Sequence, residues 1–279
     1  MDEPLTLLPT DAGEFPCALQ VLGGFRLDIG PRRYDIPLGS QRLLAFLALS
    51  RRSLARSHVA GVLWPDVGDH RAAGNLRSAL WRLPVTWLVA SDGARGTLHL
   101  DPLVRLDLDA AADLARRWIG GTVVDGDVEP GLSMLQSEIL PDWYEDWLDG
   151  HRERFRQLRL HGLEAMAERL SGQRSFSEAL QAALAAVEGD PLRESAQRTL
   201  ISVHVAEGNT VEALRQLRRF ERLLHDELGI APGGLRDLIP IEARPAIRPG
   251  RAARGTPASI RGRPEASAGS RGGGPRPRA

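Results

Sequence analysis

The sequence predicts a mainly α-helical protein with small β elements, in which a winged helix-turn-helix domain precedes an all-α domain of tetratricopeptide-like helical repeats and a disordered tail. Three observations support this fold class. Residues 18–108 mix short alternating apolar segments with three helix-period segments, residues 109–240 contain a 34-residue repeat, and residues 241–279 are mostly Arg, Pro, Gly, Ala and Ser. We expect residues 1–17 to be a flexible N-terminus and 241–279 to be disordered, because the tail holds too little apolar material to offset the entropy of ordering.

Charge is segregated along the chain, although the formal net charge is zero. Residues 1–17, 18–108, 109–240 and 241–279 carry net charges of −4, +5, −8 and +7. A basic domain followed by an acidic one is an expected electrostatic signature of nucleic-acid binding by the basic domain.

Several function classes lack residues to support them. The single cysteine, Cys17, precludes a disulfide within the chain and a cysteine-based zinc site. We find no phosphate-binding loop, no nucleophile-elbow serine and no histidine pair at metal-ligand spacing, so we expect no enzymatic activity, cofactor or metal. No apolar run reaches the roughly 20 residues of a membrane span and no signal-peptide pattern is present, so we expect a soluble, cytoplasmic protein without membrane contact.

Residues 18–108 show the element order of a winged helix. Apolar side chains alternate from Leu19 to Ile29 and from Tyr34 to Leu38, which indicates short antiparallel strands. Helical spacing then predicts three helices: residues 41–52 capped by Ser40, a short helix from its cap Ser57 to Trp64-Pro65, and residues 69–83 capped by Asp69. Strands over 87–90 and 97–100, joined by the turn-rich tip 91–96, complete the pattern as a hairpin wing.

The third helix carries the side chains for which we predict DNA contact. At about 100° per residue, Ala73, Leu76, Leu80 and Leu83 fall within one arc, which we expect to face the core. The opposite arc combines small residues, which permit close approach, with Arg and Asn side chains, which can make bidentate hydrogen bonds to guanine and adenine edges. The residues of this arc are Arg71, Gly74, Asn75, Ser78, Trp81 and Arg82.

Three runs in this domain resemble the DNA-binding half of the actinobacterial antibiotic regulatory proteins. They are Val21-Leu22-Gly23-Gly24-Phe25-Arg26-Leu27, Gly39-Ser40-Gln41-Arg42-Leu43-Leu44-Ala45-Phe46-Leu47-Ala48-Leu49 and Asn75-Leu76-Arg77-Ser78-Ala79-Leu80-Trp81-Arg82-Leu83. The resemblance implies an OmpR-type winged helix with its third helix in the major groove and its wing near the minor groove. It also implies a transcriptional activator, often of biosynthetic gene clusters, that binds direct repeats in double-stranded promoter DNA with RNA polymerase nearby.

The same resemblance assigns the individual contacts. Base edges or adjacent phosphates would be faced by Arg71, Asn75, Ser78, Trp81 and Arg82, with Arg77 flanking them. Phosphates would be contacted by Arg42, Arg51, Arg52 and Arg56, and Arg95 would lie on the wing. Two simpler interpretations stay open: Trp81 is partly core, and the arginines form a solvated face.

A 34-residue repeat is the main signal in residues 109–240, where Glu178-Ala179-Leu180 recurs as Glu212-Ala213-Leu214. This tetratricopeptide period predicts two helix-turn-helix units, at about 160–193 and 194–227, with a turn at Gly208 and with a long helical segment over 143–170. Shorter helices are expected over 110–119 and 132–135. We interpret Trp143, Tyr144 and Trp147 as core aromatics rather than as a ligand-binding group.

The family resemblance continues here, in the runs Leu140-Pro141-Asp142-Trp143-Tyr144-Glu145-Asp146-Trp147 and Pro191-Leu192-Arg193-Glu194-Ser195-Ala196, which resemble the bacterial transcriptional activator domain. The resemblance then covers roughly residues 19–232 and implies dimer contact, polymerase contact or reception of a signal. Two tandem half-sites need two protomers, so a homodimer is an option that could assemble only on the promoter. Two alternatives to a DNA-binding activator remain open: a helical-repeat protein adaptor and a ligand-gated repressor.

Overall fold

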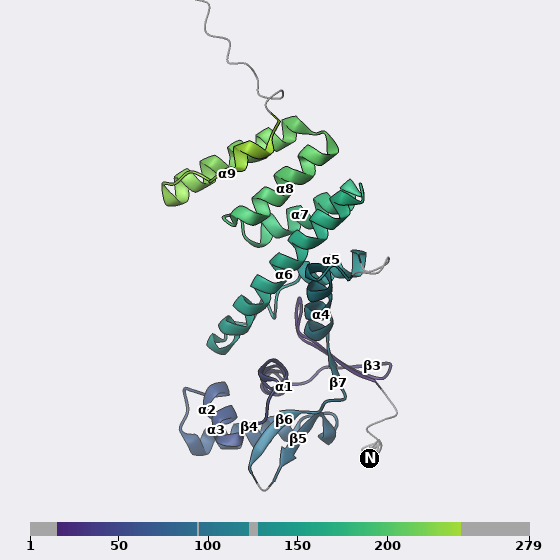
Figure 1. Ribbon diagram of the computed structural model, residues 1–279. Coiled ribbons are helices and arrows are strands. Elements are labelled where there is room, and N and C mark those ends of the chain that lie inside the picture. Colours follow the sequence, from purple (N-terminus) through teal and green to yellow (C-terminus); the bar gives the residue numbers. More distant parts are fainter. Residues whose placement is uncertain (1–15, 94, 123–127, 241–279) are drawn as a thin grey trace, which may run out of the picture. The chain divides into compact units, whose positions relative to one another are not determined.

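The computed structural model describes residues 16–93, 95–122 and 128–240 and confirms the predicted fold class (Figure 1). Small sheets and three helices form a winged helix-turn-helix in the N-terminal half, and a succession of antiparallel helices follows. The predictions of a flexible N-terminus and a disordered tail fall outside the described residues, apart from Pro16 and Cys17. Within the part of the chain that the structure describes, no helix is long and apolar enough to span a membrane.

Two small sheets frame the N-terminal half. The first has the strand order β3 (Arg32–Tyr34), β2 (Arg26–Ile29), β1 (Cys17–Gln20) and β7 (Val104–Leu106), and only the β1–β7 pair is parallel. The second has the order β4 (Leu54–Ala55), β6 (Thr97–Leu100) and β5 (Val89–Asp92), all antiparallel. Cys17 lies buried in β1, where burial raises the pKa of its thiol to about 11.

Three helices lie between these strands in the chain: α1 (Leu38–Ser50), α2 (Arg56–Leu63) and α3 (Asp69–Trp81). All three predicted helices are present, but their predicted N-caps are wrong. The N-cap residues are Pro37, Ala55 and Gly68, whereas Ser40, Ser57 and Asp69 lie inside the helices. Ser40 shows the physical reason most clearly, because its buried hydroxyl donates a hydrogen bond at 2.8 Å to the carbonyl oxygen of Ala79 on α3. A tertiary hydrogen bond has taken the place of the cap.

The predicted strand over 87–90 also needs correction. Residues Thr86–Leu88 form a short 3-10 turn, η1, and the strand β5 begins only at Val89. The second strand of the hairpin, β6, has the predicted bounds.

The C-terminal half consists of helices α4 (Asp107–Ile119), α5 (Val128–Gln136), α6 (Asp146–Gly172), α7 (Phe176–Gly189), α8 (Glu194–Glu207) and α9 (Thr210–Leu228), followed by the short turn η2 (Leu235–Leu238). The starts of α7 and α9 are 34 residues apart, as the repeat predicts, and Gly208 closes α8 with a φ of +90°. The long helix begins at Asp146 rather than Trp143, because the residues before it form an irregular segment. Arg152 holds that segment by donating to the carbonyl oxygens of Ile139 and Trp143 at 2.9 and 2.7 Å.

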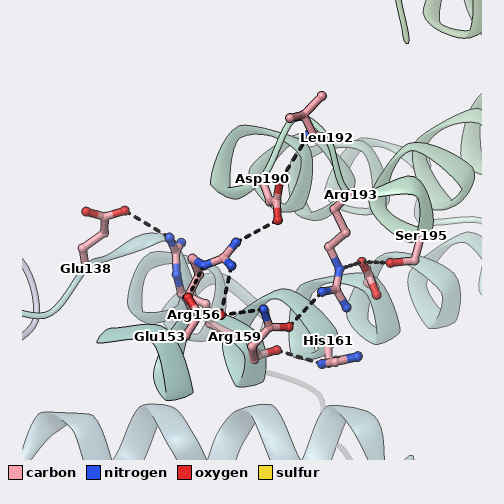
Figure 2. Close-up of polar contacts among 11 residues, drawn as sticks. Glu138, Glu153, Arg156, Arg159, His161, Asp190, Leu192, Arg193 and Ser195 are labelled. Carbon is pink, nitrogen blue, oxygen red and sulfur yellow. Dashed lines mark hydrogen bonds and ion pairs between the residues drawn. The ribbon is translucent and has the colours of Figure 1, made fainter. Parts of the chain in front are cut away.

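A polar network joins α6 to the connection between α7 and α8 (Figure 2). Arg156 donates to a carboxylate oxygen of Asp190 at 2.7 Å. Glu164 accepts hydrogen bonds from Nε of Arg193 at 2.7 Å and from the hydroxyl of Ser195 at 2.8 Å. The network therefore pairs the charged groups at this contact and links α6 to the residues between α7 and α8. It also gives a structural role to two residues of the Pro191–Ala196 run.

One hydrophobic core contains side chains from both halves of the chain. Leu43 and Leu76 of the winged helix share it with Leu108, Leu148 and Phe155. Backbone hydrogen bonds reinforce the junction, since Leu140 N donates to Val21 O and Gly23 N to Glu138 O, each at 2.8 Å. The winged helix is therefore completed by residues that follow position 108, and the predicted domain boundary between 108 and 109 falls inside α4.

Asp107, the first residue of α4, supplies a polar part of this junction. Its carboxylate oxygens accept hydrogen bonds from the backbone N–H groups of Val21 and Leu22, each at 2.9 Å. Burial raises the pKa of this carboxyl, while the N–H donors oppose that shift. The carboxylate thus ties the end of β1 to the start of the helix that leads into the second half.

We predict that Asp107→Ala lowers the free energy of unfolding by about 2–3 kcal/mol, because two partly buried N–H groups lose their acceptor. Asp113→Ala is the matched control, since this exposed residue of the same helix makes only a surface ion pair with Arg116. Urea denaturation of the full chain measures both. Equal effects of the two substitutions would contradict the role given to Asp107.

Candidate nucleic-acid interface

Helix α3 packs on the core through a stripe of small and aliphatic side chains. Ala72, Leu76 and Ala79 are buried, and Leu83 just beyond the helix is nearly so. The sequence predicted Ala73 and Leu80 in this stripe, but both are only half-buried. The small side chains of Ala72 and Ala79 are buried instead, and the Ser40 hydroxyl bonds the Ala79 carbonyl directly. The buried stripe is therefore rotated by about 50°, or about half a residue, from the predicted one.

The outward side of α3 carries the predicted contact residues. Arg71, Arg77, Ser78, Trp81 and Arg82 are exposed, and Asn75 is half-buried. Trp81 has 85% of its surface exposed, so the alternative that it is partly core is wrong.

At Gly74 this side of α3 carries no side chain. A methyl group added there would meet only a guanidinium nitrogen of Arg77, at 3.7 Å, which is ordinary van der Waals contact. Packing inside the protein therefore gives no reason for a glycine at this position. A glycine in a helix interior costs roughly 1 kcal/mol relative to alanine.

The rotation of the buried stripe divides the exposed residues into a crest and a flank. Opposite the stripe lie Gly74, Arg77 and Trp81, together with His70, an exposed residue that was not among the predicted contacts. His70 is four residues before Gly74, so helical spacing places it on the crest once the stripe is known. The flank is formed by Asn75, Ser78 and Arg82, which line a hollow of about 290 Å³ beside Pro37, Gly39 and Trp64.

Four of the predicted phosphate-contacting or wing arginines lie outside α3 on the surface of the winged helix. Arg51 and Arg52 follow α1, and Arg51 forms an ion pair with Asp109 of α4. Arg56 opens α2, where its backbone N–H donates to Gly96 O of the wing at 3.0 Å. Arg95 lies at the tip of the β5–β6 hairpin and has 83% of its side chain exposed.

Arg42 has a different environment from the other arginines. Its guanidinium is 2.7 Å from a carboxylate oxygen of Glu145, and both side chains are only 20% exposed. The same oxygen accepts a hydrogen bond from the indole N–H of Trp147 at 2.9 Å, while Nε of Arg42 is buried without a partner. In this structure Arg42 therefore joins the two halves of the chain, and it also lines an open hollow of about 710 Å³, so its phosphate contact stays a prediction.

The aromatic cluster near Arg42 is only partly core. Trp143 stacks on Phe25 with ring centroids 6.0 Å apart, and Trp147 meets Phe46 edge-on at 5.1 Å. Tyr144 is 97% exposed, which contradicts the interpretation of all three aromatics as core. Two of the three thus fasten the segment before α6 to the winged helix.

Metal ions in proteins are held by clusters of ligating side chains. Across 16–93, 95–122 and 128–240, no group of three or more His, Cys, Asp and Glu side chains is placed to hold a metal ion. What α3 and the hairpin offer is a surface of hydrogen-bond donors on a basic domain.

Comparison with known proteins adds two findings. Residues 122–238 match the family model of the bacterial transcriptional activator domain. Among solved structures, the chain resembles Mycobacterium tuberculosis EmbR in complex with a low-affinity phosphopeptide, with 18% sequence identity and a TM-score of 0.60. The match covers 81% of this chain but 64% of the EmbR chain, so this chain spans less than two thirds of that protein. No curated protein matches the sequence.

We predict a coupling energy of about 1–2 kcal/mol between Arg42 and Glu145, because their ion pair is largely shielded from water. A double-mutant cycle with Arg42→Ala and Glu145→Ala, followed by urea denaturation, measures it. The exposed pair Arg116–Asp113 is the control and should couple by less than about 0.5 kcal/mol. A coupling no larger than that of the control would show that the Arg42–Glu145 contact does not hold the halves together.

Proposed function

We propose that this chain, a transcriptional regulator that joins a winged helix to a bacterial transcriptional activator domain, binds promoter DNA through the outward side of α3. The observation that carries the proposal is the composition of that side. An exposed tryptophan, a glycine without a packing role, exposed Arg and Ser side chains and a half-buried Asn suit close contact with base edges and phosphates.

The proposed contacts follow from side-chain chemistry. Arg71 and Arg82 donate bidentate hydrogen bonds to guanine or hold adjacent phosphates, and Asn75 pairs with adenine. Arg71 and Arg82 are eleven residues apart, about 16 Å along the helix axis, which spans four to five base-pair steps of about 3.4 Å. Arg77 and Ser78 contact the strand backbones beside them. Arg51, Arg52, Arg56 and the wing residue Arg95 add phosphate contacts that do not depend on sequence.

The second half supports a role at promoters. The family match at 122–238 and the fold confirm the predicted resemblance to regulators of the actinobacterial antibiotic regulatory type. By that resemblance we propose an activator in the cytoplasm that binds direct repeats as two protomers, with an OmpR-type placement of α3 in the major groove and with RNA polymerase as its protein partner. Biosynthetic gene clusters are the proposed targets.

Footprinting and gel-shift titration on the DNA upstream of the chain's own gene test this function. We expect a protected direct repeat whose affinity falls steeply as salt rises, because phosphate contacts release counterions. The triple variant Arg71→Ala, Asn75→Ala, Arg82→Ala should lose affinity for that repeat by at least about a hundredfold, at roughly 1–3 kcal/mol for each bidentate contact, and lose much less for random DNA.

The control for the triple variant is the double variant Arg154→Ala, Arg215→Ala. It also removes two positive charges, but from exposed positions in the second half. Equal losses on specific and random DNA would show that α3 does not read sequence. A stable protein partner in pull-downs, with no DNA retention at any salt concentration, would favour the adaptor function instead.

We predict opposite effects of Gly74→Ala on folding and on binding. The free energy of unfolding should rise by about 0.5–1 kcal/mol, because alanine has the higher helix propensity and meets no close neighbour. Affinity for the protected repeat should fall at least about fivefold, because the methyl group blocks the approach of α3. Gly150→Ala, in an open part of α6, is the control. It should stabilise the fold to the same extent and leave the DNA affinity unchanged. Unchanged DNA affinity in Gly74→Ala would show that the crest of α3 is not part of the DNA interface.

A further inference from the structure

The indole of Trp81 is the exposed feature of α3 that hydrogen bonding to DNA does not explain. It is the last residue of the helix, with 85% of its surface exposed. At 100° per residue it lies roughly 170° around the helix from the centre of the buried stripe. An apolar side chain this large, left uncovered by the described residues at the crest of a face that otherwise carries polar and small residues, is suited to contact with an apolar partner.

The chemistry of the major groove restricts what that partner can be. The base edges there present hydrogen-bond acceptors and amino donors, and the one apolar substituent among them is the 5-methyl group of thymine. An indole has a single donor, Nε1–H, and otherwise a flat apolar surface. Among base edges in the major groove, thymine therefore offers the apolar contact that Trp81 lacks.

The neighbours of Trp81 leave room for such a contact. Arg77, one helical turn earlier, directs its guanidinium back toward Gly74, within 3.7 Å of the position a methyl group would take there. Ser78 turns its hydroxyl to the carbonyl oxygen of Gly74 at 3.1 Å. Neither polar group covers the indole. One turn of the helix is about 5.4 Å, so Trp81 lies one or two base-pair steps beyond Arg77 along the groove.

We propose that Trp81 is a specificity-determining residue that selects thymine at one position of each half-site through contact with its 5-methyl group. The proposal rests on the proposed function, in which α3 enters the major groove. It adds a base preference at the C-terminal end of α3, beyond the positions assigned to Arg71, Asn75 and Arg82.

The test uses uracil, which lacks only the methyl group of thymine and keeps its pairing. The full chain first selects its site from a random duplex pool, and each thymine of that site is then replaced in turn by deoxyuridine. The wild type should lose about fourfold in affinity at one position of each half-site, the effect of one methyl group. Trp81→Ala should bind the thymine duplex about as weakly and be insensitive to the same replacement.

Three controls sharpen the measurement. Tyr144→Ala removes another exposed aromatic and should respond to deoxyuridine as the wild type does. Trp81→Phe keeps an apolar face and should retain part of the sensitivity. At the sensitive position, a 5-methylcytosine·guanine pair should bind more tightly than a cytosine·guanine pair, because it restores the methyl group.

The outcomes distinguish DNA binding by α3 from recognition of the thymine methyl group by Trp81. If the wild type selects a site but tolerates deoxyuridine at every thymine, or if Trp81→Ala stays as sensitive as the wild type, Trp81 does not read the methyl group while DNA binding by α3 stands. If no site is enriched from the pool, the proposed function and this inference fall together. If Trp81→Ala leaves DNA affinity unchanged but abolishes self-association, Trp81 contacts a second copy of the chain and the inference is overturned.

Discussion

The close packing of α3 against the core decides what the surface of the winged helix can offer. Ala72 and Ala79 are buried, and the Ser40 hydroxyl of α1 bonds the Ala79 carbonyl. This contact fixes the rotation of α3 about its own axis. Once that rotation is set, His70, Gly74, Arg77 and Trp81 point outward whatever their chemistry, and every proposal about DNA depends on it.

A second constraint comes from the shared core at the junction of the two halves. The sheet of the winged helix is completed by β7, and residues beyond it provide Leu108, Leu148 and Phe155 to the same core. Asp107 and the Arg42–Glu145 pair add polar contacts across the junction. Packed side chains rather than a linker therefore connect the helical repeats to the winged helix.

The sequence predicted the order and type of the helices and of the hairpin because those depend on local periodicity, but not the short strands β4 and β7. The apolar spacing of α1 to α3, the 34-residue repeat and the Trp64-Pro65 break are all visible in the printed residues. The prediction failed where a contact with a residue distant in the sequence determines the role of a side chain. Ser40, for example, donates a hydrogen bond to α3 instead of capping α1. Arg42 is a further case, because its partner Glu145 lies 103 residues away in the sequence and no local pattern links the two.

The candidate site was predictable in composition and not in fine geometry. Arg71, Asn75, Arg77, Ser78, Trp81 and Arg82 could be selected because they lie opposite apolar residues at helical spacing. A rotation of the buried stripe by about 50° then separated the crest from the flank and added His70. Whether alanine or leucine is buried at each turn depends on the neighbours packed against it.

A cleavage reagent carried by α3 itself tests the central claim most directly. With Ser78→Cys as the exposed thiol, an iron chelate can be attached selectively, because the only other cysteine, Cys17, is 1% exposed and has a thiol pKa raised to about 11. If α3 lies in the major groove, we expect oxidative strand cleavage centred on that groove within each protected half-site. Cleavage spread evenly along the duplex, or none above that of the free chelate, would contradict that placement.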